Sequence, residues 1–264
     1  MHVGMGVIFQ AEDERRTDRD VYQNELRLAE LAEPLGFDSI WGVEHHFTNH
    51  TICPDVLQYL TYIAARTQRI QLGSMVVVLP WHHPMRVAEQ VMMLDHMSGG
   101  RVILGIGRGL GRVEFEGLGV RQEDSREIFT EAAQMILQGL ERGYCEFNGK
   151  FVKQVRRDIR PRPFKSFRGR TYAAAVSPES ALILAKLGIG ILIMPQKPGT
   201  RWRPSFESTG ASSRRSMAPR RHRRSSPAGS SATRTRSGRA SRRTSTSAAT
   251  GARWYGITSS WGAI

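Results

Sequence analysis

The chain has 264 residues, two cysteines and a formal net charge of +14. Two cysteines far apart in the sequence exclude a disulfide-rich scaffold and a cysteine zinc site, and no apolar run is long enough to span a membrane. The first residues, MHVGMGVIFQ, have no basic start and predict no signal peptide, so we expect a soluble cytoplasmic protein.

Residues 1–200 alternate short apolar runs with segments of helical period, which predicts an α/β protein with a parallel sheet covered by helices. Strands are predicted at residues 3–9, 39–43, 70–79, 102–106, 172–176 and 189–193. Helices are predicted at residues 20–35, 54–66, 85–97, 125–142 and 180–187. The early strands recur at a nearly constant interval, which fits a (β/α)8 barrel as well as a doubly wound sheet.

Two segments depart from this alternation. Residues 109–169 are too long for one helix and two loops, so we predict an insertion with a small hairpin at residues 144–155. Residues 201–264 hold 14 arginines, no lysine and one acidic residue, Glu207, which leaves residues 1–200 close to neutral. This tail contains no Leu or Val and is dominated by Ser, Arg, Ala, Gly, Thr and Pro, so it is predicted to be disordered.

Two explanations of the tail stay open. An evolved basic arm would bind nucleic acid without sequence specificity, because its arginines would release counterions. A shift of reading frame in GC-rich DNA would give the same composition, since such codons out of frame encode mainly Arg, Ala, Gly, Pro, Ser and Thr. The composition favours the frame shift, and it divides the chain into a folded portion, residues 1–200, and a tail, residues 201–264.

Two histidine pairs follow the second and third predicted strands. His45 and His46 lie in the segment VEHHFTNH, and His82 and His83 lie in PWHHP. Adjacent residues of an extended chain point to opposite sides, so each pair supplies one inward histidine, which disfavours a metal site. A hydrogen-bonded loop histidine and an acid–base or cofactor contact both stay open, and the second is favoured because histidine titrates near neutral pH.

A glycine-rich segment, RVILGIGRGLGR, follows the fourth predicted strand. It does not spell the dinucleotide fingerprint, because Leu110 stands where that pattern needs glycine. Gly107 and Gly109 would let Arg108 and the backbone approach an anion closely. A close-packed strand end with a solvent-exposed arginine is an equally good interpretation.

The segment AAAVSPES has the pattern of a helix N-terminus. Ser177 suits the cap, Pro178 the first helical position and Glu179 the first turn. Such an N-terminus either binds phosphate through its free N–H groups or is a cap without a ligand. Arg108 at the end of the preceding strand favours a phosphate site shared by the two loops.

Three blocks together resemble the bacterial luciferase-like flavin-dependent monooxygenases: GFDSIWGVEHHFTNH, LGSMVVVLPWHHPMRVAEQVMMLDHMSGGRVILGIGRG and YAAAVSPES. The resemblance covers roughly residues 1–200. It implies a (β/α)8 barrel of the TIM-barrel type, usually dimeric, that uses reduced FMN and molecular oxygen. This chain supplies about six strands, so the implied barrel is incomplete and has two unpaired edges, and we expect it to fold poorly, bind flavin weakly or be inactive.

The resemblance also implies roles for individual residues. His45 and Glu44 match the histidine and glutamate at the flavin, with His45 as the base. Met75 and Val76 match residues that lie against the flavin ring, where the family has a cis peptide bond. Glu114 is a looser match to an acidic residue of the luciferase subunit. The phosphate of FMN is assigned to Arg108, Ser177 and Ser180.

The implied chemistry is oxidation of a small organic substrate, an aldehyde among the candidates, through a flavin C4a-hydroperoxide that the protein shields from water. The implied partners are a flavin reductase that supplies FMNH2 and a second copy of the chain. A deazaflavin-dependent oxidoreductase on the same fold is the main alternative. A non-catalytic product that binds flavin, or nucleic acid through the tail, is the other.

Overall fold

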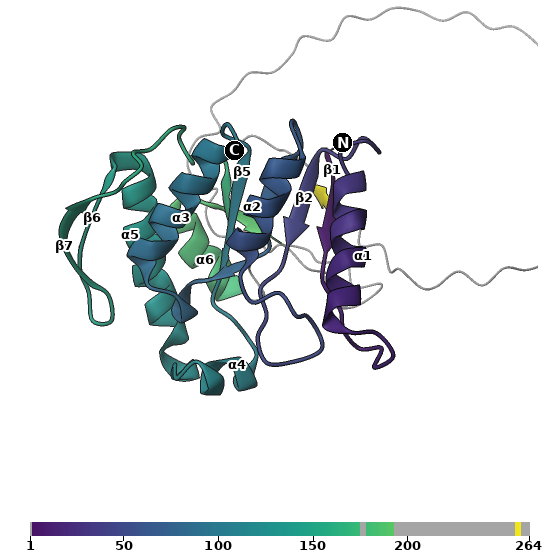
Figure 1. Cartoon of the computed structure of the whole chain (residues 1–264). Coiled ribbons are helices and arrows are strands. Elements are labelled where there is room, and N and C mark those ends of the chain that lie inside the picture. The colour runs from purple at the N-terminus through teal and green to yellow at the C-terminus, as the bar shows by residue number, and fades with distance from the viewer. Residues whose placement is uncertain (1, 175–177, 193–256, 260–264) are drawn as a thin grey trace, which may run out of the picture. The chain divides into compact units, whose positions relative to one another are not determined.

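The helices and strands alternate along the chain in the order that the sequence predicts. A computed structural model describes residues 2–174, 178–192 and 257–259 (Figure 1). Its strands are β1 His2–Val7, β2 Ser39–Gly42, β3 Gln71–Ser74, β4 Val77–Val78, β5 Val102–Gly107, β6 Tyr144–Asn148, β7 Lys153–Asp158, β8 Thr171–Ala174, β9 Gly190–Leu192 and β10 Ile257–Ser259. Its helices are α1 Asp18–Leu31, α2 Val56–Arg66, α3 Pro84–Met97, α4 Arg112–Gly117, α5 Ser125–Arg142 and α6 Pro178–Leu187, with 3-10 turns at Leu79–Trp81 and Gln122–Asp124.

The fold is built around one curved sheet. Its strand order is β10-β1-β2-β3-β5-β8-β9, and β4 pairs with β5 beside this path. Every neighbouring pair is parallel except β1 and β10. The six parallel strands β1, β2, β3, β5, β8 and β9 form a partial TIM barrel. The (β/α)8 prediction is therefore confirmed over the doubly wound alternative, since strands in chain order are neighbours in one direction around the sheet.

The strands are buried because nearly continuous apolar runs face helices on one side and the barrel interior on the other. All six residues of β5 are buried, and so are all four of β2. The α5 helix packs its buried face, which includes Ala132 and Ile136, toward α3 and the sheet. Burying a large aliphatic side chain stabilises the fold by about 1.5–3 kcal/mol, so this core dominates the free energy of folding.

The third predicted strand, residues 70–79, is broken in the structure. It splits into β3, a cis peptide bond between Met75 and Val76, and β4. The Ser74 hydroxyl donates to the Gly105 carbonyl at 2.8 Å and accepts from the Gly105 N–H at 2.9 Å. This side-chain bridge replaces a regular backbone ladder where β3 ends, and β4 then pairs with the end of β5.

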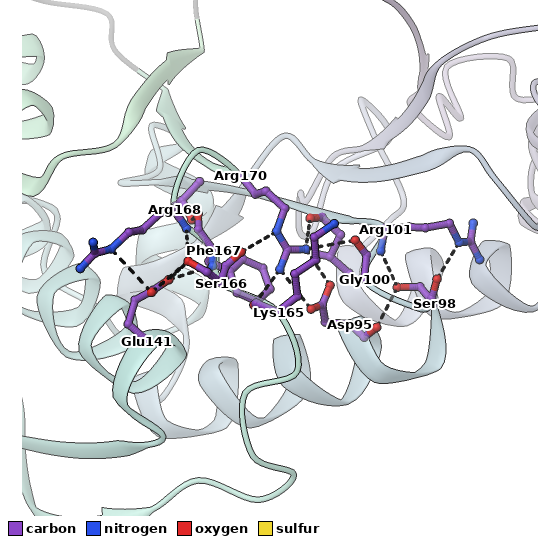
Figure 2. A network of polar contacts seen from close by, with 12 residues as sticks. Asp95, Ser98, Gly100, Arg101, Glu141, Lys165, Ser166, Phe167, Arg168 and Arg170 are labelled. Atoms are coloured by element: carbon purple, nitrogen blue, oxygen red, sulfur yellow. Dashed lines mark hydrogen bonds and ion pairs between the residues drawn. The ribbon is translucent and has the colours of Figure 1, made fainter. Parts of the chain in front are cut away.

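Two arginines join the strands at their amino ends. Arg170, directly before β8, donates to both oxygens of the buried Asp95 of α3 at 2.8 and 3.1 Å, and to the Val102 carbonyl at 2.9 Å (Figure 2). Arg101, directly before β5, donates to backbone carbonyls at the end of α2 and before β3, those of Ala64, Thr67 and Ile70. The amino ends of β3, β5 and β8 are therefore held by ion pairs and hydrogen bonds inside the protein.

The predicted insertion contains the predicted hairpin. Strands β6 and β7 pair antiparallel and lie beside α5, away from the main sheet (Figure 1). The Glu131 carboxylate of α5 accepts from the N–H groups of residues 150, 151 and 152, which fixes the hairpin turn on the helix. The insertion also contains α4, which the sequence patterns did not predict because its six residues are too few to show a period.

Of the predicted tail, the structure describes Ile257–Ser259 alone, and the rest of residues 201–264 lies outside the described residues. These three residues form β10 and pair with His2, Val3 and Gly4 of β1. No strand was predicted there. The expectation of two unpaired edges is corrected by this pairing, because the β1 edge has a neighbour.

Candidate active site

A cavity of about 280 Å³ lies at the carboxyl ends of the strands. In a parallel barrel this end carries the active site, because successive βα loops converge there. Six of the seven site residues expected from the sequence line the cavity: Glu44, His45, Met75, Val76, Arg108 and Ser180. The other lining residues are Val78, Trp81, Gly107, Gly109, Leu110, Glu114, Arg126, Phe129, Ala174, Ile183, Leu184 and Leu192.

Glu44 is a buried carboxylate that follows β2, and three protein groups donate hydrogen bonds to it. Its Oε1 lies 2.7 Å from His82 Nε2 and 3.4 Å from His46 Nε2, and its Oε2 accepts from the Val78 N–H at 3.1 Å. An ionised carboxylate is an acceptor only, so both imidazoles donate to it. Through these hydrogen bonds Glu44 joins β4 and the two histidine segments to the end of β2.

The electrostatics of this group follow from the same contacts. Burial by itself would raise the pKa of Glu44, but hydrogen bonds from His46, His82 and the Val78 N–H lower it below the ordinary 4.5. Burial likewise opposes the charged form of His82, yet the hydrogen bond and charge of Glu44 raise the His82 pKa above the ordinary 6.5. Glu44 is therefore ionised at neutral pH.

His45 is the histidine of its pair that lines the cavity. Its Nδ1 lies 3.0 Å from Glu114 Oε1, and its backbone N–H donates to the Cys53 carbonyl at 3.1 Å. His46 instead packs edge-on against Trp81 and donates to Glu44. The structure thus brings one histidine of the pair to the cavity, as the alternation of an extended chain predicts.

Glu114 is a second buried carboxylate, and it belongs to the unpredicted helix α4. Its side chain is 4% exposed, and its Oε1 accepts from both the His45 ring and the His46 N–H at 3.0 Å. Gly111, at the start of α4, leaves room for it, since a Cβ on Gly111 would overlap the Glu114 carboxylate. The family resemblance gave Glu114 as a looser match to an acidic residue, and its pairing with His45, 69 positions away, leaves no local pattern in the sequence.

The Met75–Val76 segment lies between β3 and β4 and forms one wall of the cavity. Its peptide bond is cis, as the resemblance implies. The Val76 side chain packs against Gly107 of β5, where a Cβ would overlap it. Gly109 has a φ of +83° and lies against Val78 and Trp81. These glycines allow close packing of the wall, which was one of the two interpretations of the GIGRG segment.

Arg108 lies between those glycines and lines the cavity. Within the described part of the chain it has no hydrogen-bond or ion-pair partner, whereas Arg101 and Arg170 are fully paired. An unpaired guanidinium in a partly buried position suits an anion. The packing and the anion interpretations are therefore compatible, because the glycines pack while the arginine between them stays available.

The helix N-terminus predicted from AAAVSPES begins α6 at Pro178. Ser180 lines the cavity, while Ser177 lies outside the described residues. Strands β5 and β8 are hydrogen-bonded neighbours, with Ile106 opposite Ala173, so the Arg108 loop and the start of α6 follow adjacent strands. The donor set and the apolar wall fit a flat ring system that carries an anionic group.

A partial parallel barrel with a cavity at the carboxyl ends of its strands belongs to the TIM-barrel class of folds, in which this end carries the active site. Residues 1–249 match the model of the luciferase-like monooxygenase family, and the chain belongs to this family. The match extends past residue 200. The position of the boundary between folded portion and tail therefore stays a prediction.

Two curated relatives illustrate the family. The chain is 32% identical over 187 residues to the alkanal monooxygenase alpha chain of Photobacterium leiognathi, covering 71% of this chain and 52% of that one. It is 28% identical over 197 residues to the oxygenase component of the flavin-dependent trigonelline monooxygenase of Acinetobacter baylyi, covering 74% and 54%. The chain thus spans about half the length of these relatives.

Solved structures agree on the fold. A monooxygenase, RslO1 from Streptomyces bottropensis, superposes with a TM-score of 0.69 at 29% identity, over 74% of this chain and 60% of that one. The tetrahydromethanopterin reductase of Methanopyrus kandleri, which depends on coenzyme F420, gives 0.54 at 25%, over 72% and 55%. A 3,6-diketocamphane monooxygenase component from Pseudomonas putida, solved with FMN, gives 0.61 at 20%, over 72% and 57%, which shows the fold alone.

Proposed function

We propose that this chain forms the cofactor side of an FMNH2- and O2-dependent monooxygenase site that oxidises a small organic substrate, with aldehydes among the candidates. The observation that carries the proposal is one cavity lined by His45, by the cis Met75–Val76 wall and by Arg108, whose guanidinium is unpaired among the described residues. These three elements come from the exits of β2, β3 and β5, which the parallel sheet places side by side.

Each residue has a distinct part in the proposal. Arg108 binds the phosphate of FMN through charge-assisted hydrogen bonds, together with the start of α6. Met75 and Val76 lie against the flavin ring, and the apolar side chains of α6 and β9 exclude water from it. When bound, reduced flavin supplies the electrons that activate oxygen. His45 accepts or returns a proton at its Nε2 atom, while Glu44 holds the surrounding loops in place.

The family relatives support the wider setting of this proposal. The trigonelline enzyme is an oxygenase component, so a separate flavin reductase is the proposed source of FMNH2. We propose a homodimer and a cytoplasmic location on the same grounds of resemblance. Within the described residues, no helix has the length and apolar character needed to cross a bilayer.

A ligand titration tests the proposal and separates FMN from the deazaflavin alternative. The whole chain is titrated with FMN, with riboflavin, which lacks the phosphate, and with F420, and binding is followed by fluorescence. We expect saturable binding of FMN and about tenfold weaker FMN binding by Arg108→Ala, the loss of about 1.5 kcal/mol typical of one hydrogen bond to a charged group. Riboflavin affinity should be the same in both proteins.

The control variant is Arg112→Ala, because Arg112 lies on α4 and pairs with Glu116 at the surface. It should bind FMN like the unaltered chain. Binding of F420 in preference to FMN would replace the proposal by the deazaflavin alternative. No saturable binding of either, or an equal loss of FMN and riboflavin binding in Arg108→Ala, would contradict the assigned cavity.

A further inference from the structure

His45 and Glu114 form a pair whose geometry constrains the histidine tautomer. The two atoms nearest each other, His45 Nδ1 and Glu114 Oε1, lie 3.0 Å apart. Glu114 is 4% exposed and the His45 side chain is 39% exposed, so the carboxylate is the buried member of the pair and the imidazole the accessible one. A carboxylate accepts and cannot donate, so the proton of a neutral His45 ring belongs on Nδ1.

The position of the Glu114 carboxylate is fixed by its own contacts. Its Oε1 also accepts from the His46 N–H at 3.0 Å, so the two donors on one oxygen set the position of the group relative to the β2 exit. Its Oε2 side lies against Gly111, where no Cβ could fit. The Glu114 residue is held in turn by α4, through a backbone hydrogen bond from its N–H to the Gly111 carbonyl at 3.1 Å.

The second ring nitrogen of His45 is available. Among the described residues, His45 Nε2 has no hydrogen-bond partner, and the ring lines the cavity. The charged groups that line the cavity with it are Glu44, Glu114, Arg108 and Arg126. The His50 ring lies edge-on against His45, with the ring centroids 5.4 Å apart. The Glu44 carboxylate accepts hydrogen bonds from His46, His82 and the Val78 N–H. Of the two carboxylates that line the cavity, Glu114 is therefore the one that contacts His45.

We propose that Glu114 is the positioning residue of His45: it holds the ring as the Nδ1–H tautomer and leaves Nε2 as the unprotonated nitrogen on the cavity side of the pair. This deepens the proposed function, because a base needs one nitrogen free of its proton and a fixed ring orientation. Through Glu114, the helix α4, for which the sequence predicted no role, contacts the residues that follow β2.

The tautomer is measurable without any flavin. Protein labelled with ¹⁵N-histidine is examined by long-range ¹H–¹⁵N NMR at about pH 8.5, where imidazoles are neutral. The eight histidines are distinguished by comparison with His45→Gln. We expect His45 to be the Nδ1–H tautomer in the unaltered chain and in Glu114→Gln, whose amide oxygen keeps the acceptor. In Glu114→Ala the Nδ1 partner is lost, and a mixture shifted toward Nε2–H is expected.

Glu116→Gln is the matched control, because Glu116 lies on the same helix and pairs with Arg112 in solvent. It should leave the His45 signals unchanged. An Nε2–H tautomer in the unaltered chain overturns the inference without any variant, and an unchanged tautomer in folded Glu114→Ala does the same. Because these signals are read on the flavin-free chain, the inference and the FMN titration succeed or fail separately.

Substrate turnover, where the titration shows FMN binding, gives a second result. Glu114→Ala should lower kcat at least tenfold with little change in KM, since it alters the base and leaves Arg108 and the Met75–Val76 wall in place. Glu114→Gln should recover most of kcat because it keeps the tautomer. A rise in KM without a fall in kcat would overturn a positioning role.

Discussion

The two buried glutamates of the cavity differ in what they contact, and the contacts separate their roles. Glu44 accepts hydrogen bonds from two imidazoles and a backbone N–H. Glu114 contacts the one histidine ring that lines the cavity. The family resemblance placed Glu44 at the flavin together with His45. Both carboxylates line the cavity, but Glu114 is the one that contacts the His45 ring.

The Glu44–His82 pair predicts a pH-dependent contribution to stability. Glu44, with a lowered pKa, stabilises the fold above about pH 4.5, and this is lost as the pH falls through its folded pKa. His82, with a raised pKa, stabilises it below about pH 6.5, and this is lost as the pH rises through its folded pKa. Both contributions are complete between these two values.

His82→Gln should therefore unfold at a lower temperature than the unaltered chain by an amount equivalent to about 1.5 kcal/mol near pH 5.5, with a smaller difference near pH 8.5. Thermal unfolding followed by circular dichroism at several pH values measures it. His83→Gln is the control, because His83 is exposed and its side chain caps nothing. A destabilisation that is constant from pH 5.5 to 8.5 would show that the ion pair does not titrate as described.

Individual site residues were predictable from the sequence where a polar or charged residue directly follows a predicted apolar strand. His45, Arg108 and Ser180 stood out by position after predicted strands, and the structure brings all three to one cavity. The apolar lining from α6 and β9 was not predicted. Leu184 and Leu192 look like any core residue, because the sequence does not tell a side chain that lines a cavity from one that fills the core.

At the level of elements, the two ends of the sheet are built differently. The amino ends of β3, β5 and β8 are joined by Arg101 and Arg170, whose guanidinium groups are satisfied inside the protein. The carboxyl ends carry the cavity and Arg108, which has no partner in the part of the chain that the structure describes. Stability and ligand binding are thus assigned to opposite ends of the same strands, as in barrel enzymes generally.

This division predicts that removing Arg170 destabilises the fold without altering ligand affinity. Arg170→Ala leaves the buried Asp95 without its ion-pair partner, which should lower the free energy of unfolding by about 3 kcal/mol. Arg168→Ala, two residues away, removes an exposed arginine 3.7 Å from Glu141 and should cost less than about 0.5 kcal/mol (Figure 2). Chemical denaturation of both variants provides the comparison.

The FMN affinity of folded Arg170→Ala, measured at low temperature, should equal that of the unaltered chain. Equal destabilisation by the two substitutions would contradict the assigned importance of the Arg170–Asp95 pair. A large fall in FMN affinity in Arg170→Ala alone would show that the two ends of the sheet are coupled.

The order of elements was predictable because parallel strands buried on both faces read as apolar runs, and because helices between them show a clear period. The break at Met75–Val76 was not visible in the strand pattern, since VVV continues the apolar run through it. It was expected only from the family resemblance. The helix α4 and the strand β10 are too short to give a period, so neither was predicted.

For the whole molecule, the distribution of charge poses the main question. Nearly all of the net charge of +14 lies in residues 201–264, where 14 arginines replace the mixed charges of the preceding portion. We propose that this change of composition at residue 200 marks a shift of reading frame. The family match extends to residue 249 and so includes most of the tail, which this proposal has to explain. An evolved basic arm is the competing explanation.

Translation of the coding DNA beyond codon 200 in the other two frames decides between them. We expect one frame to restore apolar runs alternating with helical periods, because the barrel pattern of residues 1–200 should then continue. The codons of residues 1–200 provide the control: translated out of frame, they should give the same excess of Arg, Ser, Ala and Gly as the tail. If neither frame restores the pattern, the basic arm is genuine, and its binding to nucleic acid should weaken steeply with salt, since each phosphate contact releases counterions.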